Sequence, residues 1–551
     1  MSIPPPLISG FKDLQVTGDS SQNARPAAAS SRALEFLQSL GSFTRKSPLQ
    51  SLMSFHQLIT STPIIDRNLA CDFIISPPED LINRLPFEIL LIIFTICCDD
   101  GVISSDVIRR TVQTNVLLSH VCRNWRDVVC RSPRLWSTII IKFMSEPERT
   151  LARIRTYIER SGTRPLDIVW TEFGYRRQMG MPVIRELFST SHRWRTLDFQ
   201  LPPHAIDYFD AHPIVGGCPQ LESASISLSH WDPVDAQRFI DQLHLAQPEG
   251  SLTALTWRGD GDSRLPSTMP WAQLKRLSLD AKLSVEDVCT VLKHCTSGLR
   301  DLYIGNLVQQ RGDFDDFDMD ALLGSPSIGS SQDNRDHSCD IILQSLEKLT
   351  VVTADASKHL FNRLQVPVLR ALRVESSNWA RGPIHHQELE RLLRRSMCTV
   401  RSLKLDDPNI DEDYLLVLLQ QETLQHLQCL DIQQPMVTST LLSLLTPDYS
   451  WAASPTMPEL RTLRLGDCHS SDQNIAKLVR TRTVDAMSDP NAHGVHRLRV
   501  LDVAFTDERH KHPMDIKWVE HCAERTGLDH LLQWRDDDRP SSFRPMDIDR
   551  F

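Results

Sequence analysis

The sequence predicts an α/β protein in which a small module of three helices is followed by an irregular solenoid with a curved parallel sheet. The first observation is a phrase of the form L-x-x-L-x-hydrophobic, which recurs at least eleven times between Trp194 and Val503, with most copies 22 to 33 residues apart. That spacing accommodates one short strand and a returning helix, and such units are stable only when neighbours stack and bury their apolar edges. The second observation is a compact apolar helical stretch that precedes the repeats.

The repeats define a register. Each copy has a central apolar residue, followed two positions later by a second one, as expected for a strand that alternates between core and solvent. The centres are Leu197, Ala224, Leu255, Leu277, Leu302, Leu349, Leu372, Leu403, Leu430, Leu463 and Leu501. We therefore expect these residues to lie side by side across one sheet.

The composition excludes several classes of protein. The chain has 551 residues, 41% of them hydrophobic and 24% charged, and a formal net charge of -10. This acidic balance argues against a large nucleic-acid surface, which requires a clustered basic excess. The thirteen cysteines form no C-x-x-C pair, so reduced and mostly buried thiols are expected in place of a disulfide framework or zinc site.

A membrane partner is not expected either. The apolar run at 87–98 is shorter than the ~20 residues that a spanning helix needs. The first residues, Met1 to Pro6, lack both the basic start and the apolar stretch of a secretory signal. The predicted location is therefore cytoplasmic, nuclear or both.

Composition and periodicity also predict the domain organisation. Polar stretches rich in Ser and Pro or in charge cannot bury enough surface to offset the entropy of ordering, whereas residues near Arg149 to Ser161 place Leu151, Ile154 and Ile158 on one helix face. The expected segments are a disordered arm at 1–79, a helical module at 80–140, a linking helix at 141–164, a solenoid at 165–534 with a loop insertion near 308–342, and a disordered tail at 535–551.

The helical module has more apolar surface than it can bury by itself. The run from Ile89 to Phe94 covers more than one helix face, and Leu117, Val121 and Trp125 recur at helical spacing before Pro133 interrupts the pattern. A helix with two apolar faces in so small a module is suited to a partner's groove. The alternative is that both faces pack internally against the first repeats.

These residues resemble the F-box. The matching segments are INRLPFEILLIIF at 82–94 and LLSHVCRNWRDVVCRSPRLWSTI at 117–139, although the stretch between them is longer than in compact F-boxes. The whole layout is similar to that of fungal, basidiomycete-type F-box-like proteins. The resemblance implies docking on a Skp-family adaptor within a cullin-RING ubiquitin ligase. The adaptor-binding residues that it implies are Leu85, Pro86, Glu88, Ile89, Phe94, Val121, Trp125, Pro133, Leu135 and Trp136.

The repeats are similar to leucine-rich repeats, although only the segment ending at Cys468 satisfies the full L-x-x-L-x-L-x-x-N/C pattern. Outward strand positions would face a partner protein. Their candidates for substrate binding are Tyr303, Arg373, Lys404, Asp431 and Arg464. The three cations could receive an acidic or phosphorylated peptide, and the alternative is an ordinary solvated face of mixed charge.

No metal site, cofactor or catalytic centre is expected. An EF-hand counted from Asp313 would need Gly and Glu where the chain has Asp318 and Gly324. The zinc-ligand types at 468–469 and 493–496 match no common spacing. No phosphate-binding loop, nucleophile elbow or H-E-x-x-H helix is present.

The sequence therefore predicts a non-catalytic substrate receptor of a Skp-cullin-F-box type ubiquitin ligase, which holds the adaptor by its helical module and an unknown protein substrate by its solenoid. One alternative is a scaffold or recruitment protein that joins no ligase. A third class is a hydrolase whose catalytic residues are dispersed along the chain.

Overall fold

The structure is a computed structural model that describes residues 85–99, 114–142, 147–172, 181–228, 230–245, 250–262, 265–308, 341–353, 357–376, 386–407, 410–433, 435–449, 455–488 and 494–534. The chain divides into two compact units, with the boundary between Arg131 and Ser132. The predicted arm at 1–79, the predicted tail at 535–551 and residues 309–340 of the predicted insertion lie outside the described residues.

The first unit contains three described helices, α4 (Phe87–Asp99), α5 (Thr114–Ser119) and α6 (Arg123–Cys130). Pro86 stands immediately before α4, and its carbonyl accepts the N–H groups of Ile89 and Leu90 at 3.1 Å each. The core forms where Leu90 and Phe94, one helical turn apart, are fully buried, and the Phe94 ring lies 4.8 Å from that of Trp125. The described part of this unit thus has the three-helix content that the sequence predicts.

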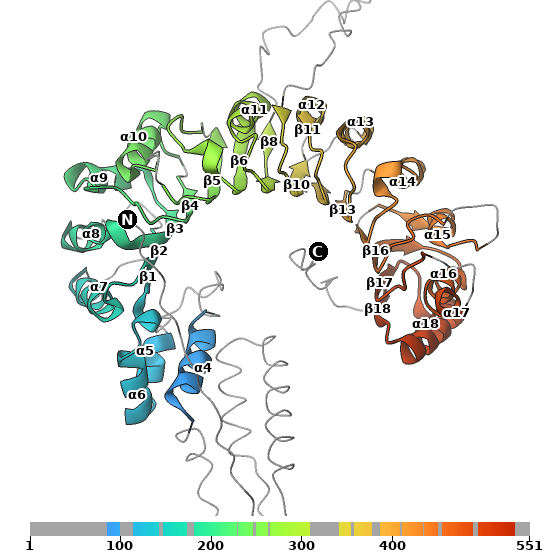
Figure 1. Cartoon of the computed structure of the whole chain (residues 1–551), viewed down its shortest axis with the longest axis horizontal. Helices are drawn as coiled ribbons and strands as arrows, with labels where there is room; N and C mark the ends of the chain where they lie inside the picture. Colours follow the sequence, from blue (N-terminus) through green and yellow to red (C-terminus); the bar gives the residue numbers. More distant parts are fainter. Residues whose placement is uncertain are drawn as a thin grey trace, which may run out of the picture. The chain divides into compact units, whose positions relative to one another are not determined.

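The second unit is built on a sheet in which every pairing is parallel. Within this unit the strands line the inner side of an arc and the helices cover its outer side (Figure 1). The strands on the main path are β1 (Thr138–Lys142), β2 (Leu166–Thr171), β3 (Trp194–Gln200), β4 (Ser223–Ser227), β5 (Ala254–Asp262), β6 (Arg276–Ser284), β7 (Asp301–Ile304), β10 (Lys348–Thr353), β12 (Ala371–Ser376), β13 (Ser402–Asp406), β14 (Cys429–Ile432), β16 (Thr462–His469), β17 (Val500–Phe505) and β18 (Asp529–Trp534).

Short elements complete this unit. The two-residue strands are β8 (Leu307–Val308), β9 (Ile341–Ile342), β11 (Leu364–Gln365) and β15 (Val437–Thr438). The α-helices are α7 (Pro147–Ser161), α8 (Met181–Phe188), α9 (Ile206–Ala211), α10 (Pro233–Leu243), α11 (Val285–His294), α12 (Ser357–Arg363), α13 (His386–Ser396), α14 (Glu412–Leu419), α15 (Ser439–Leu445), α16 (Asn474–Arg480), α17 (Ala486–Ser488) and α18 (Pro513–Thr526). None of the helices in the described ranges is both long and apolar enough to cross a membrane.

The predicted register is confirmed at every repeat. All eleven predicted centres are paired in one continuous line, from Leu197 opposite Ala224 to Leu463 opposite Leu501. Leu302 of β7 pairs directly with Leu349 of β10, so the sheet continues across the predicted insertion. The centres are almost completely buried, so they form the core between sheet and helices.

Two boundaries differ from the prediction. The sheet starts at β1, before the expected residue 165, since Ile139 pairs with Ile168 of β2. The helix expected as a linker is α7, the outer helix of that first turn, whose Tyr157 ring lies 4.9 Å from Trp136. The reason is that β1 reads T-I-I-I-K, a continuous apolar run without alternation, which the sequence pattern assigned to the preceding module.

The sheet also has a strand after the last predicted centre. In β18 the residue opposite Leu501 is His530, so the central position of this strand holds no leucine and does not match the repeat pattern. One glycine is required by close packing between strands: a Cβ at Gly466 would lie 2.1 Å from the carbonyl oxygen of Gln433. Gly466 therefore allows β16 to approach the chain after β14.

Candidate functional site: two interaction surfaces and a polar interlock

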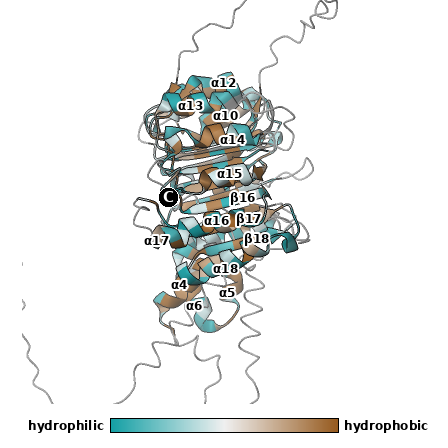
Figure 2. Ribbon diagram, turned by 90° about the vertical axis from the view of Figure 1, so that its right-hand side faces the viewer, coloured by the Kyte–Doolittle hydropathy of each residue, from teal (hydrophilic) through white to brown (hydrophobic). Residues whose placement is uncertain are grey.

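The first unit exposes an apolar surface on α4 and around α5. Ile89, Ile92 and Ile96 are spaced three and four residues apart, which places them on one face of α4, and they are 44%, 56% and 53% exposed. Leu117 and Val121, also four residues apart, are 42% and 60% exposed. We call these five residues the α4–α5 apolar face. Figure 2 shows the hydrophobic colouring of α4.

The residues implied by the F-box resemblance divide into exposed and buried groups. Within the first unit, Pro86, Glu88, Ile89 and Val121 are exposed, Leu85 and Trp125 are half-buried, and Phe94 is fully buried. Phe94 therefore supports the surface from below and does not present itself to a partner. The resemblance did not single out Ile92, Ile96 or Leu117, although their helical spacing was a visible signal.

The remaining three implied residues belong to the second unit. Pro133 is exposed, whereas Leu135 and Trp136 are buried. The Trp136 ring packs edge-on against Tyr157 at 4.9 Å, and the guanidinium of Arg160 lies 4.4 Å from its centroid. These contacts give Trp136 a structural role in the first turn of the solenoid.

The second surface is the inner face of the sheet. The register places the predicted substrate-binding residues in one row, from Tyr303 through Arg373, Lys404 and Asp431 to Arg464, with Thr350 between the first two. The register therefore brings these residues into one row, as the sequence predicts. The exposure is not uniform, because Asp431 is only 3% exposed and Arg464 only 9%.

The cations in this row do not form a free positive strip. Lys404 Nζ lies 2.9 Å from a carboxylate oxygen of Glu375 and 3.6 Å from one of Asp406, and Arg373 also pairs with Glu375. Arg464 Nε lies 3.0 Å from the Asp502 carboxylate. The acidic partners stand one strand over or two residues along, where the sequence pattern alone did not show that they were close.

Two carboxyl groups of the inner face have pKa values that are shifted in opposite directions. Burial by itself would raise the pKa of Glu375, but hydrogen bonds from Lys404 and Arg373 outweigh it and lower the pKa below the usual value. At Asp431 burial dominates and raises the pKa, although Gln433 donates a hydrogen bond to its carboxylate. The inner face thus carries a compensated charge network whose members differ in solvation.

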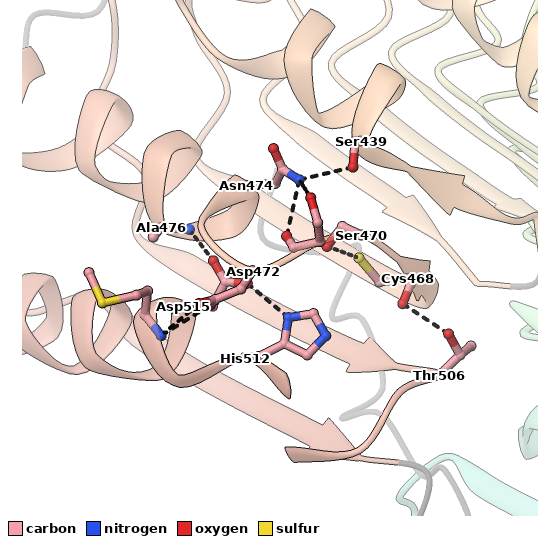
Figure 3. A network of polar contacts seen from close by, with 11 residues as sticks. Ser439, Cys468, Ser470, Asp472, Asn474, Ala476, Thr506, His512 and Asp515 are labelled. Carbon is pink, nitrogen blue, oxygen red and sulfur yellow. Dashed lines mark hydrogen bonds and ion pairs between the residues drawn. The ribbon is translucent and has the colours of Figure 1, made fainter. Parts of the chain in front are cut away.

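Neighbouring helices are joined by a polar interlock at their N-termini (Figure 3). Asp472 accepts the N–H groups of Met514 and Asp515 at 3.0 Å each, at the start of α18. Asp515 in turn accepts the N–H of Ala476 in α16 at 2.7 Å, and its other oxygen lies 3.0 Å from Nδ1 of His512. Each helix start therefore receives a carboxylate from the adjacent repeat.

A similar contact joins α14 and α15. Glu412, in the first turn of α14, accepts the N–H groups of Thr438 and Leu441 at 3.0 and 3.1 Å at the start of α15. Asn474 donates to Ser439 Oγ at 2.9 Å, which extends the contacts from α15 to α16. These carboxylates stabilise the stacking of repeats and need no other partner.

Asp472, His512 and Asp515 also have the residue types and proximity of a metal site, since one ligand atom of each lies within 4.8 Å of the others. Their oxygens are however occupied by backbone N–H groups from two helix N-termini, which carry partial positive charge. A cation would compete with these donors and be repelled by them. We therefore assign the group a structural role.

The cysteines also have structural positions. Cys468 is fully buried, its Sγ lies 3.5 Å from Ser470 Oγ, and burial raises the pKa of its thiol to about 12. Its backbone carbonyl accepts the N–H and the hydroxyl of Thr506, both at 3.2 Å. The cysteines in the described ranges are all free thiols. A thiol held protonated in this way is a poor metal ligand and a poor nucleophile.

Comparisons with known proteins add no assignment: no protein-family model matches the chain, and no curated protein is similar to it at a significant level. What stands is a long all-parallel sheet with alternating helices, consistent with a leucine-rich-repeat-like solenoid.

Proposed function

We propose that this chain is a substrate receptor of a Skp-cullin-F-box type ubiquitin ligase. Its helical unit would dock on the adaptor, and the inner face of its solenoid would hold a protein substrate. The receptor needs no catalytic group, because holding a substrate near the ligase raises its effective concentration there.

The observation that carries this proposal is the α4–α5 apolar face. Five large aliphatic side chains, each more than two-fifths exposed, lie on a small unit whose own core is already filled by Leu90 and Phe94. Exposed apolar patches of this kind are typical of protein interfaces, and a helix face with residues at i, i+3 and i+7 is suited to a groove. The F-box resemblance supplies the identity of the partner.

The test is direct binding of the purified full chain to a Skp-family adaptor. The variant Ile89→Ser, Ile92→Ser, Ile96→Ser removes apolar contact area without removing a core residue. If even one isoleucine contributes ~2 kcal/mol, as central interface residues do, the dissociation constant should rise by at least about 30-fold. Isothermal titration calorimetry with the adaptor measures this.

The matched control is Val215→Ser, Val368→Ser, Val417→Ser, which removes three exposed valines of the second unit that are 87%, 42% and 55% exposed. It should bind the adaptor as the wild type does. If the folded wild type fails to bind the adaptor, or the isoleucine variant binds with unchanged affinity, the ligase proposal is wrong. A scaffold that recruits proteins through the solenoid would then be the better interpretation.

A further inference from the structure

One column of residues follows the rim of the sheet where its strands begin. It consists of the residue two positions before each strand centre, and a continuous ladder of backbone hydrogen bonds of 2.7 to 2.9 Å joins its members, each N–H donating to the carbonyl of the preceding member. Its members are Arg195, Glu222, Thr253, Lys275, Arg300, Glu347, Arg370, Arg401, Gln428, Arg461 and Arg499. We call this column the rim.

The rim is basic although the chain as a whole is acidic. Seven of its eleven members are Lys or Arg, and two are Glu. Lys275, Arg300, Arg370, Arg401 and Arg499 are exposed, and no carboxylate in the described ranges lies within ion-pairing distance of their cationic groups. These five residues differ from the paired cations of the inner face and from Arg195 at the start of the rim, which pairs with Asp167.

The rim ends in a pocket of about 280 Å³ lined by Arg461, His496, Arg497 and Arg499. Arg461 donates from Nε and Nη2 to Nδ1 of His496, at 3.1 and 2.8 Å. Because a guanidinium has no acceptor, Nδ1 must be the accepting nitrogen, and the ring proton is on Nε2, which can donate to a ligand. Three arginines and one histidine therefore line the pocket, and none of the lining residues is acidic. The carboxylate of Glu459 lies beside the rim, where it accepts a hydrogen bond from Gln428 at 2.9 Å.

We propose that this rim pocket binds a phosphoryl group, and that the basic residues leading to it bind further acidic groups of the same ligand. Guanidinium groups match the tetrahedral oxygens of a phosphate with paired, charge-assisted hydrogen bonds. Clustering three of them costs repulsion energy, which a dianion offsets better than a single carboxylate. The site goes beyond the adaptor-docking role and involves none of its residues.

The size and the composition of the site restrict the ligand. Drug-sized ligands fill pockets of about 300 to 1,000 Å³, so a volume near the lower end suits a phosphoryl group with a few attached atoms. Single-stranded nucleic acid is recognised by basic grooves with aromatic side chains for base stacking. The rim members include no aromatic residue, so the two sources that fit are a phosphorylated side chain and a free phosphate compound.

Strand spacing predicts where additional acidic groups help. Successive strands are ~4.8 Å apart, so Arg401 and Arg370, two and three strands before Arg461, lie roughly 10 and 14 Å along the rim. An extended peptide rises ~3.3 Å per residue, which places matching carboxylates about three and four residues from the phosphorylated one.

The experiment titrates the full chain, without adaptor, with four probes: inorganic phosphate, a peptide with phosphoserine and aspartates three and four residues away on either side, the same peptide unphosphorylated, and a single-stranded oligonucleotide. The variant Arg497→Glu, Arg499→Glu changes two exposed residues, and its control Lys517→Glu, Arg525→Glu makes the same charge change on exposed positions of α18. A second variant, Arg370→Glu, Arg401→Glu, tests the extension.

We expect the pocket variant to weaken the phosphorylated probes at least tenfold, while the control leaves them unchanged. The extension variant should weaken only the peptide. Tighter binding of phosphopeptide than of phosphate assigns the source as a phosphorylated side chain, and equal binding assigns a free phosphate compound.

The proposal is wrong if no phosphorylated probe binds the folded wild type, or if the unphosphorylated peptide binds equally well. It is also wrong if the oligonucleotide binds more tightly than the phosphopeptide, or if the control variant weakens binding as much as the pocket variant does. Adaptor binding is measured separately, so either proposal can fail alone.

Discussion

The early and late repeats of the solenoid keep the same strand register with different side chains. From β2 to β5 the core is aromatic: Trp170 lies 5.6 Å from Phe199 and 6.2 Å from Phe209, and Phe209 lies 4.7 Å from Phe239. From β13 to β16 the buried apolar strand residues are mostly Leu and Ile. Helix starts there are held by carboxylates of neighbouring repeats.

The inner face differs in the same way. In the early repeats its central row carries Asp198, Ser225 and Thr256. In the late repeats it carries the buried Asp431 and the ion pair of Arg464 with Asp502. The comparison shows that stacking in register requires only that each centre be apolar. What stabilises the stack beyond that can be aromatic packing in one part and polar interlocks in another.

The largest expected effect is loss of the early aromatic core. Trp170 is fully buried and contacts four other rings, so Trp170→Ala should lower the free energy of unfolding by about 3 to 5 kcal/mol. Amide hydrogen exchange should show reduced protection in β2 to β5, with β14 to β18 retaining theirs because repeats couple mainly to neighbours.

The matched change for that experiment is Trp518→Ala, at a half-buried tryptophan on α18 whose ring contacts His521 and Arg480. It should cost about 1 kcal/mol or less. Equal loss of protection in both regions for Trp170→Ala would contradict the division into two differently stabilised parts.

The next effect tests the polar interlock. Asp515→Ala leaves the N–H of Ala476 and the ring of His512 without their buried acceptor, so it should cost about 3 kcal/mol. The control Asp413→Ala removes an exposed carboxylate in the first turn of α14 and should stay within about 0.5 kcal/mol. Chemical denaturation of both variants measures the difference, and equal stabilities would mean that the interlock contributes nothing.

The smallest effect is a pH dependence of the inner face. The pKa of Glu375 in the folded protein lies below its ordinary value of 4.5, so its contribution is fully present above that pH and is lost as pH falls. Glu375→Gln should therefore destabilise at pH 7, by about 1 kcal/mol or less because the group is partly solvated, and by less at pH 3.5.

Asp431 provides the opposite case. Burial raises its pKa, so the folded state takes up a proton more readily than the unfolded chain. The contribution of this carboxyl group to the free energy of unfolding therefore increases as pH falls. The difference between Asp431→Asn and wild type should therefore change with pH in the direction opposite to that for Glu375→Gln. Melting temperatures from pH 3.5 to 7 measure both slopes, and slopes of equal sign would contradict the assigned shifts.

The sequence was sufficient to predict the repeat register. A strand that slips by one residue turns its apolar set towards solvent, so centres such as Leu403 and Leu463 can pair in only one way that buries both. It was insufficient at the ends of the sheet, because β1 shows no alternation and β18 has His530 at its centre. The F-box resemblance placed Leu135 and Trp136 in the adaptor surface, but these side chains are buried in the second unit.

The sequence alone thus determined the in-register parallel sheet. Burial of alternating apolar residues is a local requirement, and the apolar pattern is present in the sequence of each repeat. Only the tertiary structure decided which charges are free. Lys404 meets Glu375 from 29 residues away, and Asp515 meets Asp472 from 43 residues away, because stacking brings equivalent positions of unequal repeats together. The rim cations can be found in the sequence two positions before most of the strand centres. Their alignment in one column depends on the ladder of backbone hydrogen bonds that forms when the repeats stack.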